Sequence, residues 1–73
     1  MELIRPGRYR HYKGREYRVL AMAKHSETLE DMVVYQALYG ENNIWVRPAK
    51  MWQETVELQG RSVLRFTFLE DEV

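Results

Sequence analysis

Hydrophobic and polar residues alternate along several short stretches of the chain, which is the period of a β-strand. The first stretch covers 8–12, where Tyr9 and His11 share one face and Arg8, Arg10 and Tyr12 share the other. A Pro-Gly pair precedes it and a Lys-Gly pair follows it, and both are turn signals. We therefore predict a first strand over 8–12.

A second strand is predicted from Glu16 to about His25. Strict alternation places the odd-numbered residues from Tyr17 to His25 on one face and the even-numbered residues from Arg18 to Lys24 on the other. Both faces are partly apolar, as in a well-covered strand. The polar segment 26–31 that follows is predicted to be a loop with at most one helical turn.

The most β-like segment of the chain is 32–39, which is rich in β-branched and aromatic residues. Gly40 and two asparagines then favour a hairpin loop over 40–43. The returning strand is predicted over 44–47 and ends at Pro48, which cannot donate a ladder hydrogen bond. If Ile44 and Val46 face the core, Trp45 must face outward.

The last third of the chain predicts a short turn and a second hairpin. The turn over 48–52 would place Met51 or Trp52 in the core. Strands over 54–58 and 61–69 flank a two-residue connection at 59–60. Phe66 and Phe68 share one face of the last strand and are expected to anchor the core.

Together these elements predict one all-β domain over 1–73, with five to six short antiparallel strands. Turn signals every 8–12 residues are typical of a small barrel or sandwich. Closure into a barrel would also remove the exposed edges of a short sheet.

Composition narrows the class of protein. The 73 residues include no cysteine, which excludes a disulfide scaffold and a thiolate metal site. No apolar run approaches the roughly 20 residues needed to cross a bilayer, and no signal-peptide pattern opens the chain. We expect a cytoplasmic protein with no membrane partner. Because so small a domain buries little surface, close packing or a homodimer must supply stability.

The net charge is zero, but it is unevenly distributed. Residues 1–25 hold seven Lys and Arg against two Glu, a net charge of +5, whereas 26–73 hold four basic and nine acidic residues, a net charge of −5. Such a division is typical either of a surface for an anionic partner or of strands that neutralise each other across a sheet.

The basic segment 8–15 interleaves cations with aromatic rings, which is the chemistry that holds single-stranded nucleic acid. A sequence pI near 6.7 argues against strong nucleic-acid binding. The candidate nucleic-acid residues are Arg8, Arg10, Tyr12, Lys13 and Lys24.

Catalytic and cofactor motifs are scarce. The glycines match neither a phosphate-binding loop nor a dinucleotide fingerprint, and no cofactor is expected. A metal or catalytic site formed by His11, His25 and Glu27 stays open as a third hypothesis, although no compact ligand spacing supports it. No catalytic residue is assigned.

Four sequence blocks resemble a bacterial family known as domain of unknown function 1653. They are Gly7-Arg8-Tyr9-Arg10-His11-Tyr12-Lys13-Gly14, His25-Ser26-Glu27-Thr28, Val34-Tyr35 with Ala37-Leu38-Tyr39-Gly40, and Trp45-Val46-Arg47-Pro48. The resemblance covers about 7–68 and implies a small SH3-like β-barrel, without implying an activity.

The first hypothesis for function is therefore a non-enzymatic module that recognises a protein or peptide through aromatic and polar side chains. Tyr and Trp residues often anchor such contacts. The candidate binding residues are His11, His25, Glu27, Tyr35, Tyr39, Trp45 and Arg47. Nucleic-acid binding is the alternative.

Overall fold

The computed structural model describes residues 4–70. Within this range the chain forms seven strands and one short helix. They are β1 (Gly7–His11), β2 (Glu16–Lys24), β3 (Asp31–Ala37), β4 (Ile44–Pro48), α1 (Ala49–Trp52), β5 (Thr55–Leu58), β6 (Arg61–Leu64) and β7 (Phe66–Glu70).

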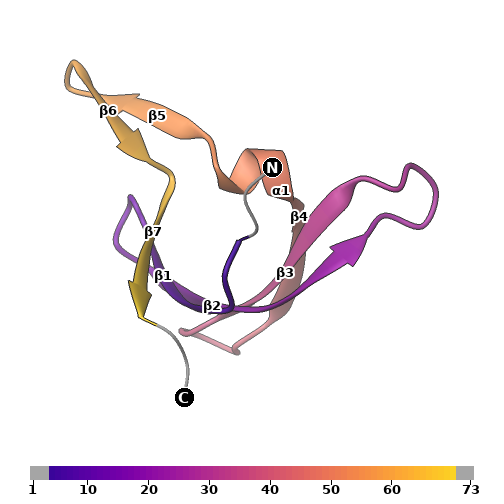
Figure 1. The fold of residues 1–73 in the computed structure, drawn as a ribbon. Helices are drawn as coiled ribbons and strands as arrows, with labels where there is room; N and C mark the ends of the chain where they lie inside the picture. The colour runs from indigo at the N-terminus through magenta and orange to yellow at the C-terminus, as the bar shows by residue number, and fades with distance from the viewer. Residues whose placement is uncertain (1–3, 71–73) are drawn as a thin grey trace.

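Five strands form one antiparallel sheet in the order β4-β3-β2-β1-β7, and β5 and β6 form a separate hairpin. Figure 1 shows the large sheet curving beneath α1, while the β5–β6 hairpin projects away from it. The predicted all-β class is confirmed. Within the described residues no pairing joins β4 to β7, so the curved sheet stops short of a closed barrel. No helix in this part of the chain is long and apolar enough to cross a membrane.

The core lies between the inner, concave face of the large sheet and α1, and it is built mainly from rings. Tyr9, Tyr35, Trp52 and Phe66 are buried there beside the smaller Val19 and Val33. Of the two residues predicted to anchor the turn, Trp52 is buried and Met51 is exposed. Phe66 is buried and Phe68 packs against the same cluster, as predicted.

A β-bulge at Leu20 overturns the predicted alternation of the second strand. Val19 pairs with Tyr35, yet Ala21 already pairs with Val34, so one extra residue lies between them. The bulge exchanges the two faces beyond Val19, so Met22, and not Ala21 or Ala23, lies on the same face as Tyr17 and Val19 and packs against the core.

The predicted final strand over 61–69 is in fact two strands, which brings the total to seven against the predicted five to six. The chain bends at Arg65, whose N–H donates to the carbonyl of Glu54 at 3.0 Å. Gln59 and Gly60 form the expected tight turn, with φ of 51° and 80°.

Ile44 and Val46 do not face the core, so the condition under which Trp45 would face outward is not met. Trp45 lies opposite Tyr35 across β3 and β4, so Trp45 and Arg47 lie on the inner face and Ile44 and Val46 on the outer face. All three apolar residues are exposed, at 59% for Ile44, 51% for Trp45 and 58% for Val46. β4 is an edge strand, so its inner-face residues also reach solvent.

Candidate functional site

The part of the inner face that α1 leaves uncovered carries aromatic rings and arginines. We call it the aromatic–arginine face. Its exposed or half-buried members are His11, Tyr17, Tyr39, Trp45, Arg15, Arg47 and Arg65, and it lies over the buried rings of Tyr35 and Phe66.

Edge-to-face ring contacts connect its centre. The ring of His11 lies 5.0 Å from that of Phe66 and 6.4 Å from that of Tyr17. The ring of Tyr17 is 5.5 Å from Tyr35 and 5.6 Å from Tyr39. These T-shaped arrangements are the favoured geometry for aromatic pairs. Strands β1, β2, β3 and β7 therefore contribute to one continuous surface.

Two of the three arginines of this face, Arg15 and Arg47, contact rings, whereas Arg65 pairs with the carboxylate of Glu54 at 3.4 Å. The Arg47 guanidinium carbon lies 5.7 Å from the Phe66 ring centre, and Arg47 Nε donates to the Tyr35 hydroxyl at 3.5 Å. The Arg15 guanidinium carbon lies 4.3 Å from the Tyr39 ring centre. Stacking on a ring leaves a guanidinium with N–H groups available to an incoming anion.

The cations around His11 make this region electropositive. Burial lowers the pKa of His11 below its usual 6.5, and the positive charges of Arg65, Arg47 and Lys13 lower it further. The Nδ1 atom of His11 accepts the backbone N–H of Lys13 at 3.1 Å, so the ring is held as a neutral acceptor on that side. An anion bound here would meet several cations at once.

The hydroxyls of Tyr17 and Tyr39 form a hydrogen bond of 2.9 Å at the rim. Burial raises the pKa of Tyr17 to about 12, aided by this hydrogen bond and by the charges of Tyr39 and Tyr35 and opposed by Arg15. Tyr17 therefore stays neutral at physiological pH and can offer only a hydroxyl.

Five of the seven predicted binding residues belong to this region. They are His11, Tyr35, Tyr39, Trp45 and Arg47. The other two, His25 and Glu27, lie in the loop between β2 and β3. There the Nδ1 atom of His25 accepts hydrogen bonds from the backbone N–H groups of Glu27 at 3.1 Å and Thr28 at 3.3 Å. The imidazole of His25 therefore stabilises the backbone of this loop.

The structure does not assemble the hypothetical metal or catalytic site. His11, the last residue of β1, lies beside the start of β2, and His25 directly follows its end; the nine residues of β2 span roughly 30 Å at about 3.3 Å per residue. Within residues 4–70 no group of three His, Asp or Glu side chains lies close enough to hold a metal ion.

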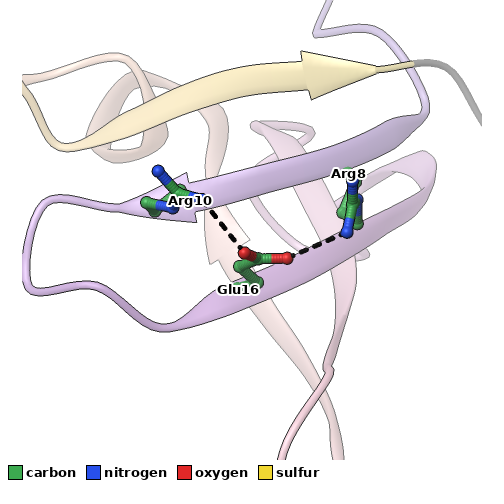
Figure 2. Close-up of polar contacts among 3 residues, drawn as sticks. All are labelled: Arg8, Arg10 and Glu16. Atoms are coloured by element: carbon green, nitrogen blue, oxygen red, sulfur yellow. Dashed lines mark hydrogen bonds and ion pairs between the residues drawn. The ribbon is translucent and has the colours of Figure 1, made fainter.

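The predicted nucleic-acid residues are also distributed over separate surfaces. Arg8 and Arg10 lie on the outer face, where their guanidinium groups meet the two carboxylate oxygens of Glu16 at 3.2 and 3.3 Å (Figure 2). Lys24 pairs with Asp31 at 2.6 Å. All three pairs join neighbouring strands, but only Lys24–Asp31 pairs a cation of 1–25 with an acid of 26–73, so cross-strand pairing accounts for only part of the uneven charge distribution.

The two remaining residues of that set lie near the aromatic–arginine face. The Tyr12 ring is 4.5 Å from the His11 ring, and Lys13 Nζ lies 5.8 Å from the centre of the Tyr12 ring.

Sequence reasoning missed Tyr17, Arg15, Arg65 and Phe66 as neighbours of the site. Tyr17 could have been found, since it lies opposite Tyr9 once β1 and β2 are paired. Arg65 and Phe66 could not, because β7 reaches the site only through its long-range pairing with β1.

Comparison with known proteins agrees with the fold. Residues 7–68 match the model of a family described as protein of unknown function (DUF1653). A crystal structure of a protein of that family from Bordetella bronchiseptica is similar, with a TM-score of 0.85 and 38% sequence identity. The match covers 96% of this chain and 92% of that one. No curated protein matches.

Proposed function

The chain belongs to the DUF1653 family of unknown function, and we propose that it is a non-enzymatic binding module. Its aromatic–arginine face recognises an acidic, extended segment of a partner protein.

The contrast between the two faces of the sheet carries this proposal. On the outer face, Arg8 and Arg10 meet the carboxylate of Glu16. On the inner face, Arg65 pairs with Glu54 at 3.4 Å, but Arg15 and Arg47 lie against rings and form no ion pair within residues 4–70. A guanidinium that lacks a carboxylate in its own chain can accept one from a partner, and the bond is charge-assisted.

The rings supply the remaining contact area. Trp45 and Tyr39 are exposed, and both are large, rigid side chains that bury much surface at little cost in conformational entropy. Aromatic residues and arginine are the residue types enriched in protein interfaces. An acidic segment with apolar residues between its carboxylates matches this composition.

Single-stranded nucleic acid would use similar chemistry, but a protein segment fits better. Arg8 and Arg10 share the carboxylate of Glu16, and Lys24 pairs with Asp31, so these three cations are already engaged within the chain and are less open to a phosphate backbone. The chain as a whole carries no net charge, whereas nucleic-acid binding domains are usually basic.

The test is a fluorescence-anisotropy titration with a labelled short peptide of alternating Glu and Val. We expect it to bind, and its counterpart of alternating Gln and Val to bind far more weakly. Arg47→Gln should weaken binding about tenfold, as loss of one charge-assisted hydrogen bond predicts. Arg10→Gln removes the same charge from the outer face and should leave binding unchanged.

Two outcomes would contradict the proposal. Equal losses for Arg47→Gln and Arg10→Gln would mean that net charge, rather than this face, attracts the peptide. Binding of an oligothymidylate in place of the peptide, steeply weakened by salt, would assign the face to nucleic acid.

A further inference from the structure

The edge strand β4 exposes backbone hydrogen-bonding groups that alternate with those used in the sheet. The N–H of Ala37 donates to the carbonyl of Asn43 at 2.9 Å, which fixes the phase of the β3–β4 ladder. Hydrogen-bonded and non-hydrogen-bonded pairs then alternate. Trp45 and Arg47 direct their N–H and C=O groups toward β3, whereas Ile44 and Val46 direct theirs away from the sheet.

Pro48 agrees with this phase. It pairs with Met32 in a non-hydrogen-bonded position, where the missing N–H of proline faces outward and costs no ladder bond. The open part of the edge is therefore short and is centred on Ile44 and Val46.

Side chains on both faces of this edge are exposed. Ile44 and Val46 form an apolar outer face, and Trp45 and Arg47 form the border of the aromatic–arginine face. Natural edge strands usually carry charges or proline that discourage pairing. β4 carries both only at its end, as Arg47 and Pro48, and residues 44–46 carry neither, which leaves this part of the edge open to another strand.

We propose that the acidic partner segment binds by β-augmentation, as a sixth strand of the large sheet beside β4. This inference rests on the proposed function and adds how the segment is held. The backbone of the segment would bond to Ile44 and Val46. Its carboxylates would alternate onto the inner face near Arg47, and its apolar residues would lie beside Ile44 and Val46.

Charge favours a partner segment over a second copy of this chain. If two β4 strands paired antiparallel about Trp45, Ile44 would lie opposite Val46 of the second copy, and Arg47 opposite its Asn43. That pairing would bring two sets of inner-face arginines to one edge and supply no carboxylate to either. An acidic strand supplies the missing charge.

Amide hydrogen exchange measured by NMR tests the mode of binding, with the alternating Glu-Val peptide as the probe. In the free protein the amides of Trp45 and Arg47 should be protected, and those of Ile44 and Val46 should exchange fast. Saturation with the peptide should slow exchange at Ile44 and Val46 about tenfold or more, as formation of new hydrogen bonds requires.

Two further changes complement this measurement, one in β4 and one in the peptide. Val46→Pro removes an N–H that points away from the sheet. It should weaken peptide binding about tenfold without changing the circular dichroism spectrum of the protein. Methylation of alternate backbone nitrogens of the peptide, on the side that would face β4, should have the same effect on the unchanged protein. This second change does not depend on the folding of a variant.

The outcomes separate this inference from the proposed function. Suppose that Arg47→Gln weakens peptide binding, but that Val46→Pro and peptide methylation do not, and that amide exchange at Ile44 and Val46 is unchanged. Binding by β-augmentation is then overturned, and the proposed function stands. If no peptide binds, the proposed function has failed. If Ile44 and Val46 are protected in the free protein, in a concentration-dependent way, a second copy occupies the edge and the inference is wrong.

Discussion

The indole ring of Trp52 lies flat on the phenyl ring of Phe66, with ring centres 3.7 Å apart and an angle of 1° between the planes. Trp52 comes from α1 and Phe66 from β7, so this contact joins the helix to one edge of the sheet. The rings of Tyr9 and Tyr35 make edge-to-face contacts with the same indole, with ring centres 5.4 and 4.9 Å from its own. One side chain thus connects three strands of a very small core.

Replacement of the two tryptophans should separate stability from binding. Trp52→Ala should lower the free energy of unfolding by about 3–5 kcal/mol, the usual cost of removing a buried aromatic. That loss is about half or more of the whole stability of a domain of this size, at roughly 0.1 kcal/mol per residue. Trp45→Ala should change stability by less than about 0.5 kcal/mol, because the side chain is half exposed. Urea unfolding followed by circular dichroism measures both.

Trp45→Ala should nevertheless weaken binding of the Glu-Val peptide, because Trp45 borders the aromatic–arginine face. If it destabilised the protein as much as Trp52→Ala does, Trp45 would be a core residue and this prediction would fail.

Stability should fall in mild acid because of His11. Burial and the nearby arginines lower its pKa in the folded protein, so the unfolded chain binds the proton more readily. Stability is then full above the unfolded value near 6.5 and is lost as the pH falls through the lower folded value. His11→Asn should reduce this loss, since Asn also accepts a backbone N–H two residues ahead. Unfolding free energies of both proteins between pH 8 and 5 (a range of roughly 1.5 units either side of the unperturbed value) provide the measurement.

Much of the fold follows from local patterns. Period-two alternation and the positions of glycine, proline and asparagine predicted strands near β1 to β4 and the two-residue turn at 59–60. They could not predict the bulge at Leu20, because a β-bulge has no obligatory sequence signature. The division at Arg65 is likewise fixed by a distant partner, the carbonyl of Glu54.

The candidate site shows the same limit. Residues such as Tyr35, Tyr39 and Arg47 could be chosen by type, because exposed aromatic and cationic side chains serve recognition. Which of the candidates meet depends on strand order, which is non-local. His11 and His25 looked equivalent along the sequence, yet His11 lies beside the start of β2 and His25 follows its end.

At alkaline pH the tyrosine pair should control stability. The pKa of Tyr17 is raised from 10.0 to about 12 in the folded protein, so the folded state holds this proton more tightly than the unfolded state. Stability is therefore full below pH 10 and falls as the pH rises toward 12. Tyr39→Phe removes the 2.9 Å hydrogen bond and should bring the pKa of Tyr17 down. Ultraviolet absorbance of tyrosinate follows the titration, and an unchanged curve would mean that burial alone sets the shift.

Leu29 should be a site where stability can be gained. Its backbone has a φ of 64°, which disfavours leucine, and its side chain is 69% exposed. Leu29→Asn should raise the free energy of unfolding by roughly 0.5–1 kcal/mol, because Asn tolerates the left-handed region. Leu64→Asn, in strand β6 with ordinary backbone angles, is the matched control and should give no gain in thermal or urea unfolding.

His25 should contribute to stability and not to metal binding. Its Nδ1 atom accepts the backbone N–H groups of Glu27 and Thr28, so His25→Ala should cost about 1 kcal/mol. His25→Asn should recover part of that loss, as Asn side chains accept such N–H groups in turns. Excess Zn²⁺ should leave the melting temperature of all three proteins unchanged, because a ligand stabilises only a folded state that binds it. A Zn²⁺-dependent rise in the unchanged protein, absent from both His25→Ala and His11→Ala, would require the two histidines to meet between different copies of the chain.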